Sequence, residues 1–172
     1  HRKLRWRDGV SDEKIYKPLA NVDEIRPILS EIAIFGGLND RQLGEVVRLL
    51  KTVSYGTDEY VCKQGEAPSH IYIIKSGKVK VIYDSNGVLL ELAAFETGDC
   101  FGETSVIGIQ AHSSSVVVIE PVDLIVLERA ALLDIFETDK ELFGLLILNI
   151  AREMSRRLYK LDEVVAKYVA SK

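Results

Sequence analysis

Short strand-like runs separated by turn residues occupy residues 53 to 128. In one run, Val79, Val81 and Tyr83 alternate with more polar neighbours, which is the period of a strand with one buried face. The residues that follow, Asp84-Ser-Asn-Gly87, place Asn-Gly at the tip of a hairpin. Several short strands with turns between them predict an antiparallel barrel or sandwich. The expected strands are 53–55, 60–63, 70–75, 78–83, 88–95, 116–119 and 124–128.

Helical patterns lie on both sides of this strand region. Before it, we expect a helix toward Ile32, capped by Asn21 or Asp23 and with Pro27 near its first turn, then a second helix capped by Asn39. After it, we expect a short helix over 129–137 and a long one over 140–169. The predicted fold class is α+β: an antiparallel β-barrel of jelly-roll type with flanking N-terminal and C-terminal helices.

Length and charge exclude several classes of function. A chain of 172 residues with 47% apolar residues fits one domain with one core. Its net charge of −4 is a poor match for nucleic acid, and the residues after Tyr159 are too few for a helix-turn-helix unit. No apolar run approaches the length of a membrane span. The two cysteines, Cys62 and Cys100, fit a reducing compartment, which predicts a cytoplasmic location.

The N-terminal residues differ in composition from the rest. Four basic residues surround Trp6, and the chain begins with His1 rather than Met, so we expect it to be cut from a longer protein or to carry a tag remnant. The basic stretch is either a solvated linker or a juxtamembrane or partner-docking segment. The expected division is residues 1–20 as linker or remnant, 21–139 as helices plus barrel, and 140–172 as a long amphipathic helix.

The 98–115 segment carries the chemistry of a binding site. Gly98 and Gly102 permit a sharp turn, and the residues after Gly102 begin a short helix whose first amide groups lack helical partners. Such amides bind anions. The carboxylate of Glu103 accepts from a hydroxyl, and three serines follow His112. These groups suit a phosphate next to a sugar hydroxyl.

This segment resembles the phosphate-binding cassette of the cyclic nucleotide-binding domains, the family that includes catabolite activator protein and the regulatory subunit of protein kinase A. Phe101-Gly102-Glu103 matches the first half of the family motif, and Gly98-Asp99 matches the turn before it. The strand region around Tyr72 to Val81 is similar too. The sequence departs from the family at His112, which stands nine residues after Glu103 where relatives carry Arg.

The resemblance implies a role for each candidate residue. It implies that the amides of Gly102, Glu103 and Thr104 meet a cyclic phosphate and that Glu103 accepts from the ribose 2′-hydroxyl. Glu103 as a carboxylate that only interacts with the helix dipole is the alternative for that side chain. The resemblance also implies that His112, Ser113 and Ser114 contact the phosphate or the base. It further implies that Val79, Val81 and Leu92 line a pocket for the base.

The implied function is regulatory sensing of cAMP or cGMP rather than catalysis. Two alternatives stay open: another anionic ligand such as a cyclic dinucleotide, and a ligand-free barrel that serves as an interaction module. The three histidines, His1, His70 and His112, are isolated, so no metal site is expected. No nucleophile elbow, Walker loop or Cys-His arrangement is found in the sequence.

The long C-terminal helix carries an apolar seam in steps of four and three. Such spacing favours a coiled-coil-like contact, although packing on the chain's own barrel explains the same pattern. In the transcription activators of the resembling family a helix in this place forms the dimer. We therefore expect a homodimer, or packing within one chain, through Ile147, Ala151, Met154, Leu158, Leu161 and Val165.

Overall fold

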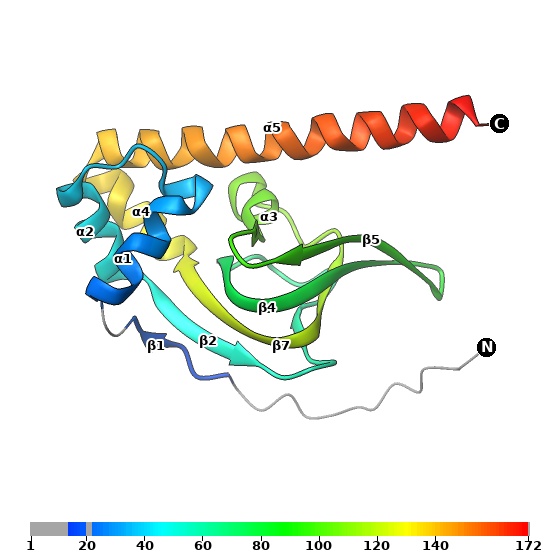
Figure 1. Ribbon diagram of the computed structural model, residues 1–172, viewed down its shortest axis with the longest axis horizontal. Helices are drawn as coiled ribbons and strands as arrows, with labels where there is room; N and C mark the ends of the chain where they lie inside the picture. Colours follow the sequence, from blue (N-terminus) through cyan, green and yellow to red (C-terminus); the bar gives the residue numbers. More distant parts are fainter. Residues whose placement is uncertain (1–13, 20–21, 172) are drawn as a thin grey trace.

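The computed structural model describes residues 14–19 and 22–171, with residues 22–24 as backbone only. The basic stretch around Trp6, and Asn21, lie outside the described residues. Figure 1 shows a twisted antiparallel sheet with helices gathered at one end and one long helix passing over it. The elements are β1 (Lys17–Pro18), α1 (Val22–Glu31), η1 (Ala33–Phe35), α2 (Asp40–Leu49), β2 (Lys51–Tyr55), β3 (Tyr60–Cys62), β4 (His70–Ser85), β5 (Val88–Glu96), β6 (Cys100–Phe101), α3 (Glu103–Gly108), β7 (Ser115–Glu128), α4 (Arg129–Thr138) and α5 (Lys140–Ala170).

The expected antiparallel jelly-roll sheet with flanking helices is confirmed. Its strand order is β1-β2-β7-β4-β5, while β3 pairs with β7 and β6 pairs with β4. Two strand pairs predicted as separate are instead continuous: 70–75 and 78–83 join as β4, and 116–119 and 124–128 join as β7. Gly77 has a φ of +91°, and a Cβ there would meet the Pro121 carbonyl oxygen at 2.2 Å. The register shifts between Ile74 and Val79, so these strands bend and shift register at the residues that look like breaks.

The interior consists of two apolar clusters on opposite faces of the sheet. In β4, Ile71 and Ile73 face the first cluster, which includes the helices, whereas Tyr72 and Ile74 face the second, which lies inside the roll. The alternation of strand side chains explains this division, because neighbouring residues point to opposite faces. We call them the helix-side core and the roll core.

Helix α2 begins at its predicted cap, whereas in α1 the alternative cap Asp23 is the second helical residue and Pro27 the sixth. Asn39 caps α2: its side chain accepts from the Gln42 amide, while the Gln42 side chain accepts from the Asn39 amide. This reciprocal capping box satisfies two amides that the first helical turn leaves without partners. The short 3₁₀ helix η1 was not predicted; it brings Ile34 and Phe35 into the helix-side core directly after α1.

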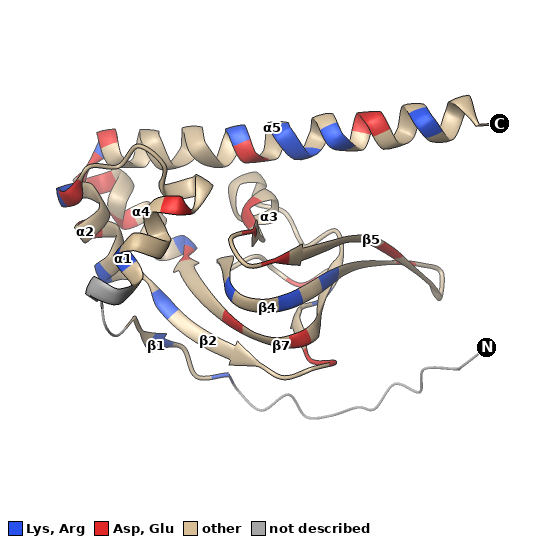
Figure 2. Cartoon of the chain, in the orientation of Figure 1, with Lys and Arg blue, Asp and Glu red and all other residues tan. Residues whose placement is uncertain are grey.

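Helix α5 has two different halves. Leu142, Leu146 and Ile150 are buried in the helix-side core, whereas Leu158, Leu161 and Val165 are exposed. Figure 2 shows acidic and basic residues interleaved along the exposed half. None of the helices in the described part of the chain is long and apolar enough to cross a membrane.

Candidate functional site

The 98–115 segment begins as a turn that only glycine fits. Gly98 and Gly102 have φ values of +92° and +86°, and a Cβ on Gly102 would lie 2.6 Å from the His70 carbonyl oxygen. β6 pairs with β4 through Tyr72 opposite Phe101, so the segment starts against the middle of the sheet. Gly102 is also the residue before α3, and its carbonyl accepts from the Val106 amide. The sequence therefore places the first amides of α3 against β4.

Glu103 is a buried carboxylate at the start of α3. Its exposed fraction is 1%. Oε1 accepts a hydrogen bond of 2.8 Å from the Arg157 guanidinium, and Oε2 has no hydrogen-bond partner among the described residues. Burial raises the pKa of Glu103, and the charge of Arg157 opposes that rise. A buried acceptor without a partner is costly, so Oε2 is a polar atom that the described side chains leave unsatisfied.

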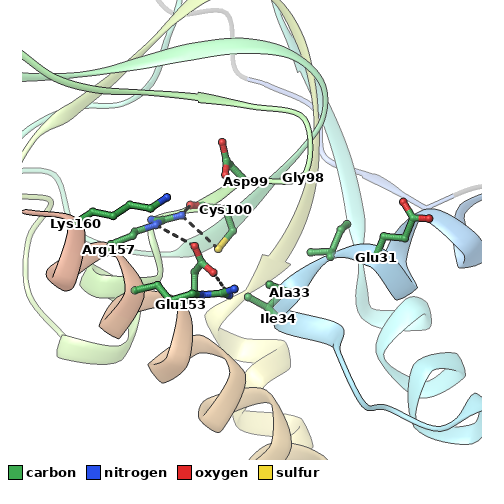
Figure 3. A pocket seen from close by; sticks show the side chains of 11 residues that line it. Glu31, Ala33, Ile34, Gly98, Asp99, Cys100, Glu153, Arg157 and Lys160 are labelled. Atoms are coloured by element: carbon green, nitrogen blue, oxygen red, sulfur yellow. Dashed lines mark hydrogen bonds and ion pairs between the residues drawn. The ribbon is translucent and has the colours of Figure 1, made fainter.

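Arg157 is the site residue that the sequence reasoning missed. It comes from α5, donates to the Cys100 carbonyl and to Glu103, and lies 3.4 Å from Glu153. Its guanidinium also covers the ring of Phe95, 4.6 Å from the centroid. Figure 3 shows Arg157 reaching from α5 toward Cys100. The available signal was helical spacing: Arg157 comes three residues after Met154 and seven after Ile150, on the face of α5 that packs on the helix-side core.

The other end of the segment is held by its main chain. The His112 amide donates to the Glu66 carbonyl, and its own carbonyl accepts from the Gly65 amide. His112 is 8% exposed, and burial lowers the pKa of its imidazole despite the charge of Glu66. An imidazole with a pKa below its usual value is mostly neutral at pH 7. Thr104 and Ser113 are exposed, and Ser114 is half-buried.

The residues expected around a base differ in their surroundings. Val79 and Val81 are buried in the roll core, while Leu92 on β5 is 59% exposed. Phe95, three residues further along β5, packs against the roll core and stacks with Phe101 at a centroid distance of 6.4 Å. The apolar surface nearest to Glu103 therefore includes an aromatic ring already covered by Arg157.

A polar cavity lies beside Arg157, where η1, the 98–100 turn and α5 meet. Its volume is about 240 Å³. Acidic and basic side chains both line it, so its charge is mixed (Figure 3). In residues 14–19 and 22–171, no group of three or more His, Cys, Asp or Glu side chains could hold a metal ion. The residues that line the cavity are Glu31, Ile32, Ala33, Ile34, Gly98, Asp99, Cys100, Glu153, Arg156, Arg157 and Lys160.

Known proteins match this chain both in sequence and in fold. A family model described as the cyclic nucleotide-binding domain matches residues 52–139. The cyclic nucleotide-gated channel beta-1 of Bos taurus is 32% identical over 88 residues, which is 51% of this chain but 6% of the channel. The chain thus spans a small fraction of the length of that relative.

Two solved structures share the fold across most of the chain. A cyclic nucleotide-binding domain from Methylobacillus flagellatus superimposes with a TM-score of 0.80 at 23% identity, covering 97% of this chain and 96% of that one. The catabolite activator protein of Thermus thermophilus superimposes with a TM-score of 0.69 at 25% identity, covering 80% and 63% of the two chains. The first of these likenesses includes the helices that lie outside the matched family region.

Proposed function

Because the chain belongs to the cyclic nucleotide-binding domain family, we propose that its 98–115 segment binds cAMP or cGMP and that α5 responds to the ligand. The observation that carries this proposal is the Oε2 atom of Glu103, buried and without a partner among the described residues. A ribose 2′-hydroxyl donating to that oxygen would satisfy it while Oε1 keeps its bond to Arg157. The function is recognition, with no bond made or broken.

The phosphate is assigned to the amides of Gly102, Glu103 and Thr104. Amides in the first turn of a helix have no partner within that helix, and the close packing of Gly102 on β4 fixes their direction. Ser113 and Ser114 supply hydroxyl donors from the other end of the segment. The exposure of Thr104 and Ser113 leaves their polar groups open to a ligand.

His112 takes the position at which relatives of the family carry Arg. A cyclic phosphate diester keeps one negative charge, and a guanidinium answers it with a permanent charge and a planar fork. Imidazole provides neither at neutral pH unless the bound anion raises its pKa. The loss of such a charged hydrogen bond costs about 1.5–3 kcal/mol, or about 10- to 150-fold in affinity, so we expect a weaker site that still binds.

The base is assigned to the roll core and β5, against Val79, Val81 and Leu92. Ala93 and Phe95 on β5 pack against the roll core, whereas the side chain of Leu92 is exposed. The placement therefore depends on the roll-core residues Val79 and Val81. Phe95 lies between this surface and Arg157.

Arg157 gives the route from ligand to helix. It links Glu103, the Cys100 carbonyl and Phe95 to α5, so a ligand that engages Glu103 or Phe95 contacts a residue that is bound directly to the helix. The ligand must bind one arrangement of α5 better than another for this to act as a switch. We propose that this preference orders the 98–115 segment and shifts the packing of the 133–158 helices.

A thermal-shift and calorimetric panel tests the proposal. Wild-type chain is titrated with cAMP, cGMP and a cyclic dinucleotide, beside Glu103→Ala and the matched exposed acid Glu120→Ala. A melting-temperature rise with cAMP or cGMP that Glu103→Ala removes and Glu120→Ala keeps is the expected result. A rise with the dinucleotide alone favours that ligand class, and no rise with any of them favours the ligand-free interaction module.

The exposed apolar stripe of α5 supports a second proposal, pairing with another copy of the chain. Ile147 and Met154 pack partly on the helix-side core, whereas Ala151, Leu158, Leu161 and Val165 are exposed. The outer part of the predicted seam, Leu158 to Val165, is therefore the part available for a homodimer. Spacing of three and four is that of a two-helix contact.

Sedimentation equilibrium decides between a dimer and a monomer. Leu161 is 57% exposed on the stripe, so Leu161→Glu is expected to convert a dimer to a monomer without loss of the fold. Ala166→Glu places the same charge off the stripe and should leave the dimer intact. A monomeric wild-type chain at high concentration contradicts the pairing.

We propose a cytoplasmic location for the domain. Cys62 and Cys100 are free and buried, and burial raises the pKa of each thiol to about 12. Both thiols are protonated at neutral pH. Free thiols are typical of proteins in a reducing compartment.

A further inference from the structure

The segment before α1 is fastened across the sheet at three points. Residues 14–19, which we call the strap, include β1, and β1 pairs with β2. The Lys14 ammonium donates to Glu59 at 2.7 Å, and Leu19 is buried in the helix-side core. Between them, Tyr16 packs against the roll core, while its neighbour Ile15 is 73% exposed. The strap thus has one residue that enters the roll.

Tyr16 contacts two residues, His70 and Tyr72, that also lie close to Gly102. Its ring stacks on His70 with a centroid distance of 4.7 Å and an interplanar angle of 1°. Its hydroxyl lies 3.3 Å from that of Tyr72. On the other side lies Gly102, where an added Cβ would be 2.6 Å from the His70 carbonyl oxygen and 3.5 Å from the Tyr72 ring. Burial lowers the pKa of His70, so its ring stacks on Tyr16 in the neutral form.

A chain of stacked aromatic rings also connects Tyr72 to Arg157. Tyr72 stacks on Phe101 at 5.1 Å, Phe101 stacks on Phe95 at 6.4 Å, and Arg157 covers Phe95. Close-packed interiors transmit small displacements because they have few voids to absorb them. The strap is therefore connected to both ends of the Glu103–Arg157 pair through packed side chains.

We propose that Tyr16 is a positioning residue for the 98–115 segment: the docked strap holds His70 and Tyr72, and these hold Gly102 in its binding conformation. Undocking of the strap loosens the first turn of α3. Ligand affinity then depends on the strap, and by reciprocity an occupied site tightens the strap. The ligand part of this inference rests on the proposed function, whereas the structural coupling does not.

Hydrogen exchange of the whole chain without ligand tests the coupling directly. The reporter is the peptide over residues 100–108, which contains the β6 pairing and the bond from the Val106 amide to the Gly102 carbonyl. Tyr16→Ala is expected to speed its protected exchange about fivefold or more, the lower range of measured couplings between sites. The peptide over α2, in the helix-side core, should not change.

Two further variants separate positioning from general loss of stability. Tyr16→Phe keeps the stacked ring and should stay within about twofold of wild type, because the hydroxyl contacts are long. Ile15→Ala changes an exposed neighbour and should have no effect. Equal acceleration of the 100–108 and α2 peptides in Tyr16→Ala, or no acceleration of the first, overturns the proposal.

The ligand arm uses whichever cyclic nucleotide raises the melting temperature of wild type. Tyr16→Ala should weaken its affinity about fivefold or more, and the bound nucleotide should slow exchange within residues 14–19. An unchanged affinity in Tyr16→Ala overturns the ligand part. If no nucleotide binds wild type, the proposed function fails, while the ligand-free exchange still decides the coupling.

Discussion

The two ends of the 98–115 segment are held by different forces. At the first end, Gly102 packs on β4 without room for a side chain and Glu103 is paired with Arg157. At the second end, His112 is held by main-chain bonds to Gly65 and Glu66. The first end is set by the fold and connected to α5. The second end is set by main-chain bonds, and its side chain at residue 112 is an imidazole without a permanent charge.

The largest expected effect comes from a substitution at Gly102, which tests how closely the first end of the segment packs against β4. Gly102→Ala puts a Cβ 2.6 Å from the His70 carbonyl at a φ of +86°. Left-handed backbone costs about 1–2 kcal/mol and overpacking about 1–3 kcal/mol, so we expect a loss of about 2–5 kcal/mol in the free energy of unfolding, measured by urea denaturation. Gly44→Ala, which meets no atom within 4 Å in the middle of α2, is the matched control and should be neutral or slightly stabilising.

The link to α5 is tested next, with two adjacent arginines. Arg157→Leu leaves Glu103 buried without a cation, and we expect a loss of about 2–3 kcal/mol at neutral pH, below the range for fully buried pairs because Arg157 is partly exposed. Arg156→Leu removes an exposed arginine that pairs with Glu153 and should cost less than about 1 kcal/mol. Equal losses in the two variants would contradict a structural role for the Glu103 pair.

The same pair predicts the sign of a pH effect. Burial already raises the pKa of Glu103, and removal of Arg157 raises it further. A carboxyl group with a raised folded-state pKa binds a proton more readily in the folded state, so stability is gained as the pH falls through that pKa. The loss caused by Arg157→Leu should therefore be larger at pH 8 than at pH 5.

This contrast also marks what could be predicted from the sequence. The alternation around Val79, the hairpin at Asn86-Gly87 and the cap at Asn39 are local signals, and the structure confirms them. The strands predicted to stop on either side of Gly77 and Pro121 are continuous in the structure; the register shifts there, and the Pro121 carbonyl lies too close to Gly77 for a side chain. Arg157 lies 54 residues from Glu103, and no local spacing predicts such a contact.

The next prediction adds the missing charge at the second end. His112→Arg supplies a permanent cation and a fork, and we expect cyclic nucleotide affinity to tighten about tenfold by calorimetry, the lower part of the range for a charged hydrogen bond. The side chain of residue 112 is buried, so an unliganded Arg there should also lower the melting temperature of the free protein. An equal or weaker affinity in His112→Arg would contradict the assigned phosphate position.

The smallest expected effect is the pH dependence of ligand binding, and it separates the two ends in one experiment. Burial lowers the pKa of free His112, and a bound phosphate would raise it. Binding then takes up a proton, so affinity is highest at low pH and is lost as the pH rises through the raised pKa of the bound state. We expect affinity to decrease about three- to tenfold between pH 6 and pH 8 in isothermal titration.

Glu103 acts in the opposite direction, because its raised pKa removes a charged acceptor as the pH falls. His112→Gln removes only the first contribution, so the difference between the two profiles isolates the imidazole; identical profiles would show that the second end makes no charged contact with the phosphate.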